Sequence, residues 1–442
     1  MTTPAHSAAR ATLAAVLLAA AVLAAAVLPA AAQAPATAPP LLTDSARRRV
    51  VDSVATVVER LYPAADTGAM IARHLRRRAA EGAYRDAADA RLFVRLLTQD
   101  LQATNEDNHL NVEIGSPAHP GGVPPSGHGV ERVERLDGNV GYLRMSHFQG
   151  GSEASRAVEA ALRYLMTTEA VILDLRNSRG GSGALSNFVI SHFTGPDTVH
   201  SLTVLDRTGR HILERYTMAR VPGPRRPDVP LYVLVDDVTR SAAEDVPFVL
   251  QNMKRATVVG TRTAGAGRNM TFIPVGDGLV ASVSVTRVLD PRTHREWERV
   301  GITPDVRVPA DSALPVAHEL ALAAIAERSG DAARKRELAL LAETVRATAR
   351  SATLPAAQLR RLVGTYGGTQ YVTVEGGRLL YQTRHAQPRV TLVPLGGDTF
   401  AAGSTRYAFA ERGGEMELRI TEADGSAIGY ARTSTSAPAR PR

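Results

Sequence analysis

Cysteine is absent from the 442 residues, so the chain has no disulfide framework, no thiolate nucleophile and no cysteine-based metal site. Neither a G-x-G-x-x-G turn nor a Walker lysine motif is present, which argues against nucleotide binding. The 12 histidines form no H-x-x-x-H or H-E-x-x-H pair. The sequence therefore predicts no metal site and no cofactor.

Lysine is scarce, since Lys254 and Lys335 are the only two, and arginine supplies nearly all of the net charge of +8. The arginines are spread along the chain, apart from clusters at 47–49 and 76–78 that lie in helical patterns and are predicted to be solvated. Aromatic residues make up only 5% of the chain, and no nucleic-acid-binding motif is present. We therefore expect no nucleic-acid partner and at most weak attraction to anionic surfaces.

The first 32 residues have the pattern of a secretory signal peptide. Arg10 precedes an apolar run over 12–29, and Ala30-Ala31-Ala32 offers a small-residue cleavage site. We expect an exported bacterial protein, periplasmic or secreted, with cleavage after Ala32. An uncleaved anchor is the alternative, because the run is just long enough to span a bilayer. An Ala/Pro-rich linker follows over 33–42.

Residues 43–115 are predicted to form an N-terminal helical domain. Asp44 and Ser45 are expected to cap its first helix, which Pro63 ends. A second helix is expected near 67–80 and a third over 86–103. A Gly/Pro loop over 115–128 follows.

Strands and helices then alternate, which is typical of an α/β layer with buried strands. The strands are predicted at 139–145, 169–175, 231–236 and 256–259, and the helices near 152–166, 182–193 and 241–253. A hairpin is predicted within 270–288, turning at 276–278. The core domain is thus expected over 116–311. Residues 312–353 are expected to be a helical linker, with one helix over 312–350. A separate antiparallel β domain is expected over 354–442, with strands at 370–375, 378–382, 389–393, 405–410 and 415–420.

The segment around Ser241 is the most informative of the core. The apolar run 231–235 predicts a buried strand, the chain turns through polar residues, and a helix begins at Ser241. A serine at such a turn has an exposed hydroxyl beside unpaired N–H groups at the positive end of a helix dipole. These features suit a nucleophile that must stabilise an oxyanion. A simple helix cap is the alternative interpretation.

Three further segments carry candidate functional residues. Gly180, Gly181 and Gly183 follow a buried strand and could aim N–H groups at an anion, or could form an ordinary turn. His109 follows Asp107 and Asn108 and is a candidate general base, although a lone histidine is more often a surface or structural residue. His147 competes with it on the same argument. Glu298, beside the only tryptophan and among apolar residues, could orient a histidine or hold a proton, or be a surface glutamate.

Four motifs together resemble the serine peptidase family of the tail-specific proteases, the tricorn core protease and interphotoreceptor retinoid-binding protein (serine peptidase family 41). They are DLRNSRGG, TRSAAEDV, VVGTRTAGAG and WERVGITPDV, and they occur in the family's order. Residues 44–110 also look like the helical segment of the retinoid-binding-protein-like branch. The resemblance covers about residues 43–310 and implies a crotonase/ClpP-like α/β core of stacked βα units.

The resemblance also implies roles for individual residues. Ser241 matches the nucleophile, His109 matches the histidine base of the tricorn-like branch, and Glu298 matches its supporting carboxylate. The N–H groups of Ala242 and of Gly180 or Gly181 match the oxyanion hole. The expected activity is that of an endopeptidase acting on peptides or unfolded protein segments.

The sequence departs from the tail-specific proteases in several places. Their Ser/Lys dyad has no counterpart, because the turn at 263–267 lacks lysine and Lys254 lies about 20 Å along the helix from Ser241. The usual PDZ domain is missing between His109 and the strand at 139. Arg299 stands where the family often has glycine, as do Ala264 and Ala266. These changes favour the histidine-based mechanism and leave the shape of the substrate pocket open.

Two other functions remain open at this stage. One is a non-catalytic binder of apolar ligands, such as a retinoid or a fatty acid, on the same fold. The other is a non-peptidase acyl-transfer hydrolase that uses the same serine. The C-terminal β domain could bind an envelope partner, and the sequence does not specify an oligomeric state.

Overall fold

The computed structural model describes residues 41–115, 126–350, 353–383 and 388–435. The predicted signal peptide of residues 1–32, nearly all of the linker 33–42 and most of the Gly/Pro loop 115–128 lie outside these ranges. No helix in the described ranges combines the length and apolarity needed to cross a membrane.

Three helices form the N-terminal region, as the sequence predicted: α1 (Asp44–Leu61), α2 (Ala65–Ala80) and α3 (Ala90–Gln102). The predicted cap of α1 was wrong by one residue. Thr43 is the N-cap, and its hydroxyl accepts a hydrogen bond from Ala46 N at 3.2 Å. Asp44 lies inside the first turn, where its charge suits the helix dipole.

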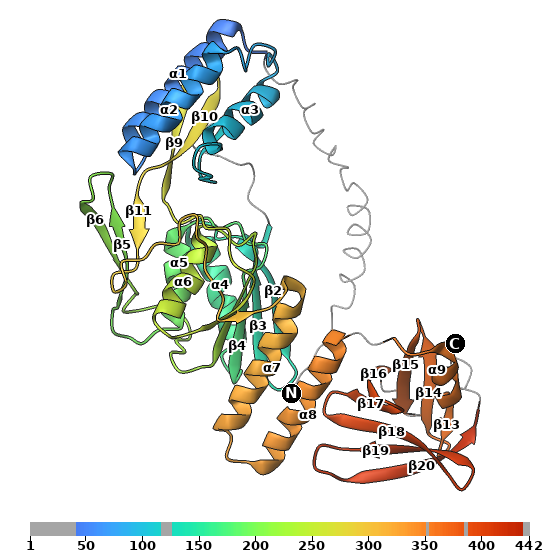
Figure 1. Cartoon of the computed structure of the whole chain (residues 1–442). Helices are drawn as coiled ribbons and strands as arrows, with labels where there is room; N and C mark the ends of the chain where they lie inside the picture. Colours follow the sequence, from blue (N-terminus) through green and yellow to red (C-terminus); the bar gives the residue numbers. More distant parts are fainter. Residues whose placement is uncertain (1–40, 116–125, 351–352, 384–387, 436–442) are drawn as a thin grey trace, which may run out of the picture.

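A hairpin from the second half of the chain completes this helical region. Strands β9 (Met270–Gly276) and β10 (Leu279–Ser284) pair antiparallel around the predicted turn, and β10 also pairs with β1 (Asn111–Ile114). The hairpin lies against the three helices (Figure 1). Its buried side chains share one apolar cluster with α1, α2 and α3. Segments about 170 residues apart in the chain therefore share one core.

The central sheet has six strands in the order β12-β8-β7-β4-β3-β2. All neighbours are parallel except β2, which is antiparallel to β3. The strands are β2 (Val130–Leu136), β3 (Val140–Met145), β4 (Ala170–Asp174), β7 (Leu231–Val235), β8 (Thr257–Gly260) and β12 (Val306–Arg307). The four strands predicted here are confirmed, and β2 was missed.

Helices cover both faces of this sheet. One face packs against α4 (Ser152–Tyr164), α5 (Gly183–His192) and α6 (Ala242–Asn252). The other face packs against α7 (Ala310–Arg328) and α8 (Ala332–Arg350). The expectation of one helix over 312–350 was wrong, because the chain breaks at 329–331 and folds back. Residues expected to be a linker thus bury the second face of the core.

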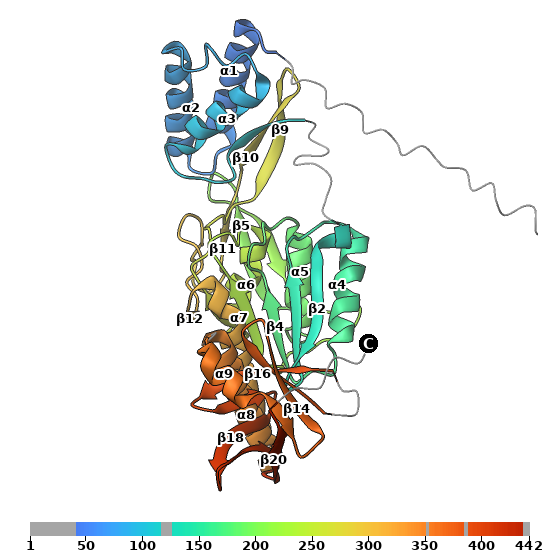
Figure 2. The same ribbon diagram turned by 90° about the vertical axis from the view of Figure 1, so that its right-hand side faces the viewer.

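A smaller sheet and a C-terminal barrel complete the chain. Strands β5 (His200–Leu205), β6 (His211–Tyr216) and β11 (Arg287–Leu289) form a sheet in the order β11-β5-β6. After α9 (Ala356–Leu362), eight strands close into an antiparallel barrel. They are β13 (Gly364–Tyr366), β14 (Gln370–Glu375), β15 (Arg378–Thr383), β16 (Val390–Gly396), β17 (Thr399–Ala402), β18 (Thr405–Arg412), β19 (Glu415–Thr421) and β20 (Ala427–Ser434). Figure 2 shows the helical region, the core and the barrel stacked in that order.

Candidate active site

Ser241 lies between β7 and α6, at the N-cap position of the helix, as the sequence predicted. Its backbone has φ 56° and ψ −128°, a conformation that costs an L-residue energy and is adopted readily only by glycine. Strained serines of this kind at a strand-to-helix turn are typical of nucleophiles. The turn therefore holds Ser241 in a geometry that ordinary helix capping does not require.

The carboxylate of Asp236 shapes this turn. It accepts hydrogen bonds from the N–H groups of Val238 and Thr239, at 3.1 and 2.9 Å. It also accepts from Asn177 N at 3.0 Å, in the loop after β4. One buried side chain thus ties the serine turn to the glycine turn.

Glu244 anchors the other side of Ser241. Its carboxylate accepts from the N–H groups of Ser241, Gly265 and Ala266 at 2.9, 2.7 and 2.8 Å, and from the hydroxyl of Thr263. Burial raises the pKa of Glu244, and these hydrogen bonds oppose the shift. The residues at 263–265, where tail-specific proteases carry lysine, are therefore held by this acid at the start of α6.

The glycine turn packs directly on Ser241. A Cβ atom on Gly180 would lie 2.6 Å from Arg240 O and 2.8 Å from both Ala242 N and Ser241 Cβ. Gly180 also has φ +80°, so glycine is required there on two grounds.

Two N–H groups beside Ser241 are available to an acceptor. Phe148 N donates to Gly180 O at 2.8 Å, and Ser182 N donates to Phe148 O at 2.6 Å. These two hydrogen bonds form a parallel β-bridge between Phe148 and Gly181. In such a bridge the N–H of Gly181 points away from Phe148. In the described parts of the chain, neither Gly181 N nor Ala242 N has an acceptor. The pair offers the donors that an oxyanion needs.

His109 is buried where α3 leads into β1. Its N–H donates to Asp107 Oδ1 at 2.9 Å, and its carbonyl accepts from Ser282 Oγ at 2.6 Å. Both ring nitrogens are buried, and neither has a hydrogen-bond partner within the described ranges. Because a buried polar atom without a partner is costly, such atoms often mark functional sites.

Asp107 is the carboxylate nearest to this ring. Its Oδ1 lies 3.6 Å from His109 Nδ1, and its Oδ2 accepts from Tyr62 and Ser284 at 2.9 and 2.8 Å. Burial alone would raise the pKa of Asp107, but the interactions with His109 and Ser284 outweigh it and lower the value to about 2. Asp107 is therefore an anion beside the histidine.

Glu298 and Arg268 extend this buried cluster. Glu298 accepts from Gly267 N at 2.7 Å, and Arg268 lies 3.6 Å from Glu298 and 3.9 Å from Asp107. Burial, with the negative charge of Asp107, raises the pKa of Glu298 to about 7, against the influence of Arg268. Glu298 makes no hydrogen bond to either nitrogen of the His109 ring.

The helical region is tied to the serine turn by Arg240. Its guanidinium donates to Asn108 O at 2.9 Å, so the residues that precede Ser241 and His109 are in contact. No hydrogen bond joins the Ser241 hydroxyl to the His109 ring. Catalytic hydrogen bonds are often long without substrate and tighten when it binds.

His147 also lies close to the glycine turn. A Cβ atom on Gly181 would be 3.1 Å from a carbon of the His147 ring. Burial lowers the pKa of His147, so its neutral form is favoured. His147 therefore borders the glycine turn that packs on Ser241.

Neither lysine is near Ser241. Lys254 follows the far end of α6 and borders a surface pocket together with Leu231, at the start of β7. Lys335 lies on α8, across the central sheet. Neither lysine is therefore placed to act as the base of a Ser/Lys dyad with Ser241.

A cavity of about 60 Å³ opens at Ser241. Gly181 and Ala242 border it on the oxyanion side, and Leu202, Val288 and Trp297 supply apolar walls. Arg215 and Asp245 line it as a buried ion pair. Sequence reasoning missed this pair and also Arg268, because each acts through partners far away in the sequence. The role of Glu244 was missed too, although the capping-box spacing of Ser241 and Glu244 is a local signal for it.

Comparison with known proteins agrees with this fold. Residues 139–308 match the model of peptidase family S41, and residues 32–128 match the N-terminal domain of that family in eukaryotic IRBP. The carboxyl-terminal-processing protease of Synechocystis sp. is 34% identical over 169 residues, which is 38% of this chain and 37% of that protein. Chloroplastic carboxyl-terminal-processing peptidase 3 of Arabidopsis thaliana is 31% identical over 170 residues, 38% of this chain and 31% of that protein. The chain thus spans well under half of these relatives.

Among solved structures, a lipoprotein from Streptococcus agalactiae matches 65% of this chain and 98% of its own, with 16% identity and a TM-score of 0.47. The family that residues 139–308 match is one of serine-type peptidases. More narrowly, the core resembles a peptidase family S41 domain, and the helical region before it resembles the N-terminal domain of that family in eukaryotic IRBP.

Proposed function

We propose that this chain is an exported serine endopeptidase that cleaves peptides or unfolded protein segments. The observation that carries the proposal is the strained backbone of Ser241 beside two N–H groups without acceptors. Export rests on the signal pattern of residues 1–32. A peptide substrate is the class that the matched family favours.

In this mechanism the Ser241 oxygen attacks the scissile carbonyl carbon while His109 takes the hydroxyl proton. The carbonyl oxygen becomes an oxyanion, which the N–H groups of Gly181 and Ala242 stabilise. His109 then passes the proton to the leaving amine, and water hydrolyses the acyl-enzyme by the reverse sequence. Gly180 keeps this surface free of side chains.

The carboxylates act through the histidine. Asp107 Oδ1 lies 3.6 Å from His109 Nδ1 and stays ionised, so its charge stabilises the ring when the ring is protonated. Glu298 anchors Gly267 and faces Arg268, and so contributes charge to the cluster without holding the ring. Arg268 limits the net negative charge of the two acids.

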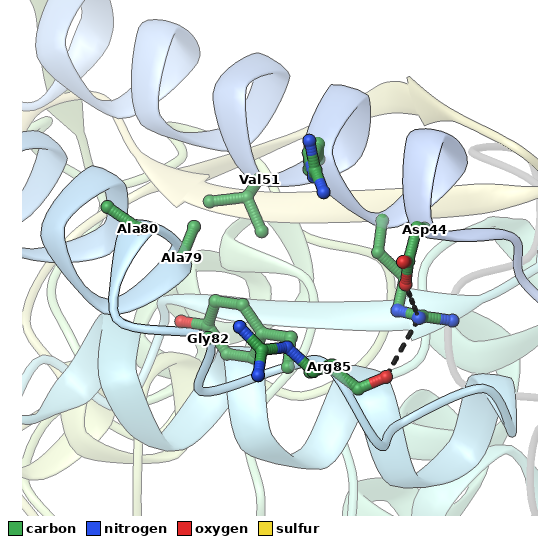
Figure 3. Close-up of a pocket in the computed structure, with 9 residues that line it drawn as sticks. Asp44, Val51, Ala79, Ala80, Gly82 and Arg85 are labelled. Atoms are coloured by element: carbon green, nitrogen blue, oxygen red, sulfur yellow. Dashed lines mark hydrogen bonds and ion pairs between the residues drawn. The ribbon is translucent and has the colours of Figure 1, made fainter.

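Neither the cavity at Ser241 nor the one in the helical region favours the alternative of an apolar-ligand binder. The space at Ser241 is about 60 Å³, whereas sites for drug-sized ligands measure roughly 300–1,000 Å³. A larger cavity of about 360 Å³ lies between α1 and α2 (Figure 3). It is bordered by Asp44 and by Arg47, Arg48 and Arg85, with Arg47 paired to Asp44. Charged walls of this kind do not suit a retinoid.

The decisive experiment compares the chain lacking residues 1–32 with its Ser241→Ala and His109→Ala variants. Each is incubated with a peptide mixture, and products are read by mass spectrometry. We expect cleavage by the wild type and its loss in both variants, while the exposed histidine variant His211→Ala cleaves normally. If only Ser241→Ala is inactive, His147→Ala is the next variant to measure.

Two further outcomes reject the proposal. If Ser241→Ala cleaves as well as the wild type, Ser241 is not the nucleophile. If the wild type cleaves esters but no peptides, the chain is an acyl-transfer hydrolase of another kind.

The variants Asp107→Asn and Glu298→Gln distinguish the roles of the two acids. We expect Asp107→Asn to lower kcat/KM by about 10²–10⁴-fold, the usual range for impaired acid–base catalysis. Glu298→Gln should have a smaller effect. The reverse order would assign the supporting role to Glu298.

A further inference from the structure

The cavity of about 360 Å³ in the helical region is separate from the candidate active site. Its wall is formed by the first half of α1, the last residues of α2 and the loop that follows α2 (Figure 3). It shares no lining residue with the cavity at Ser241. Its volume lies within the range of roughly 300–1,000 Å³ that is usual for small-molecule sites. The proposed peptidase mechanism uses none of its residues.

Arginine dominates the polar part of this wall. Arg47, Arg48 and Arg85 line the cavity, against a single acid, Asp44. Arg47 is buried, although the arginine cluster at 47–49 was expected to be solvated. It forms an ion pair with Asp44 and donates to Arg85 O at 2.9 Å. Because that pair is neutral, the wall keeps two positive charges, those of Arg48 and Arg85.

The side chains of Arg48 and Arg85 are unpaired. Within the described residues, neither guanidinium has a hydrogen bond or an ion pair. Arg49, the next residue of α1, differs, because its guanidinium lies 3.4 Å from the carboxylate of Asp277. Two like charges that line one cavity without an acidic partner repel each other. An anion bound between them would turn this repulsion into attraction.

Arg85 is held over the carboxyl end of α2. A Cβ atom on Gly82 would lie 3.1 Å from Arg85 Nη2 and 3.4 Å from its Cζ. Gly82 directly follows Glu81, the C-cap of α2. The guanidinium therefore covers the negative end of that helix dipole, which would otherwise repel an anion. At the same cavity α1 presents its first turn, the positive end of its own dipole.

The rest of the wall is apolar. Val51, Ala79, Ala80 and Tyr84 line the cavity, and Val51 and Tyr84 belong to the buried apolar cluster of the helical region. In the view of Figure 3, Val51 and Ala79 lie on one side of the cavity and Arg85 lies on the other. The cavity therefore offers a cationic surface for one group of a ligand and an aliphatic surface for a short carbon body.

We propose that this cavity binds a phosphate monoester, whose phosphate group pairs with Arg48 and Arg85. Such a group carries a charge of about −1.5 to −2 near pH 7, which matches the two unpaired arginines. Guanidinium groups donate in the planar, forked geometry that phosphate oxygens accept well. A carboxylate, with one charge, would leave one arginine unmatched. Arg47 is already committed to Asp44 and to the main chain, so it fixes the wall.

The test measures binding by isothermal titration calorimetry, with the chain that lacks residues 1–32. The probes are glycerol 3-phosphate and, as its uncharged match, glycerol. We expect glycerol 3-phosphate to bind with a Kd of about 1 mM or lower and glycerol to give no signal. Arg48→Ala and Arg85→Ala should each raise the Kd at least about tenfold, because each removes a charge-assisted hydrogen bond.

The matched control is Arg49→Ala. It removes the same charge from the same helix, but Arg49 does not line the cavity and pairs with Asp277. Its Kd should stay within about twofold of the wild-type value, since exposed charges at a distance are screened by salt. Ser241→Ala should bind like the wild type, so the result does not depend on the proposed peptidase function. The Tm of each variant checks folding.

A second arm distinguishes a soluble ligand from a lipid headgroup. Cosedimentation with phosphatidic acid vesicles, and not with phosphatidylcholine vesicles, would assign the phosphate to a lipid if it is lost in Arg48→Ala and kept in Arg49→Ala. Absence of binding to both glycerol 3-phosphate and phosphatidic acid would overturn the proposal. Equal binding by the wild type and a folded Arg48→Ala/Arg85→Ala variant would overturn it too, as would equal losses in Arg48→Ala and Arg49→Ala.

Discussion

Arg240 donates a hydrogen bond to the main-chain carbonyl of Asn108, with 2.9 Å between Nη2 and the oxygen. The first residue directly precedes the candidate nucleophile, and the second directly precedes the candidate base. The bond therefore spans the interface across which Ser241 and His109 must cooperate.

Removing this bond should impair catalysis more than folding. We expect Arg240→Ala to lower kcat/KM about tenfold, with a loss of stability of about 1 kcal/mol or less, typical of one exposed hydrogen bond. Arg207→Ala is the matched control, because Arg207 donates to Arg60 O in the same helical region. Equal activities of the two variants would show that the Asn108 contact has no special role.

Gly180→Ala should disable the site while leaving the fold intact. The added methyl would meet main-chain atoms of Arg240 and Ala242 below 3 Å, so the serine turn must shift. We expect kcat/KM to fall by about 10²-fold or more, because misplacement of about 1 Å has effects of that size. Gly195→Ala is the control, since its new methyl would have no neighbour within 4 Å. Near-normal activity of Gly180→Ala would contradict the close packing at Ser241.

Glu244→Gln should destabilise the protein. Its carboxylate accepts four hydrogen bonds, and an amide would turn a donor toward some of those donors. We expect a loss of about 1–3 kcal/mol, the range for leaving a buried polar group unsatisfied. The measurement is the urea midpoint. Glu153→Gln, an exposed acid in the first turn of α4, should change stability by less than about 0.5 kcal/mol.

Glu298 should make stability depend on pH near neutrality. Its pKa in the folded chain is raised from 4.5 to about 7, so the folded state binds the proton more tightly than the unfolded state. This contribution is fully present below pH 4.5 and is lost as the pH rises through 7. The contribution of Glu298 to the free energy of unfolding is at most about 3 kcal/mol, at 1.36 kcal/mol per pKa unit.

The measurement for Glu298 is the difference in unfolding free energy between the wild type and Glu298→Gln at pH 5 and pH 8. Taking the difference cancels the contributions of other groups. Asp107 does not interfere, because its pKa is lowered to about 2 and its effect falls at more acidic pH. A difference that does not change between the two pH values would refute the buried, protonatable state of Glu298.

Much of the core could be predicted from local sequence patterns. Strands such as 231–235 are continuous apolar runs, and the buried residues of α4 recur at helical spacing. Strand β6 was missed because five of its six residues are exposed, so it shows no apolar alternation. The break at 329–331 was missed because Ser329-Gly330 is a weak stop signal within a helix-forming composition.

The candidate site was predictable only in part. The strand-to-helix turn and the glycine turn are short motifs, and Ser241 and Gly180 do lie in contact. The partners of His109 were beyond local patterns. Glu298 and Asp107 are 191 positions apart, and only the fold of the β9–β10 hairpin brings Arg268 between them.

The β9–β10 hairpin has a consequence for how the chain can be divided. Because the hairpin leaves the core to complete the sheet of the helical region, no single cut in the polypeptide separates the two. A fragment without residues 43–115 would carry a hairpin stripped of its apolar cover and prone to aggregate. Gene recombination could therefore exchange the C-terminal barrel as a module, whereas the helical region and the core must be inherited together.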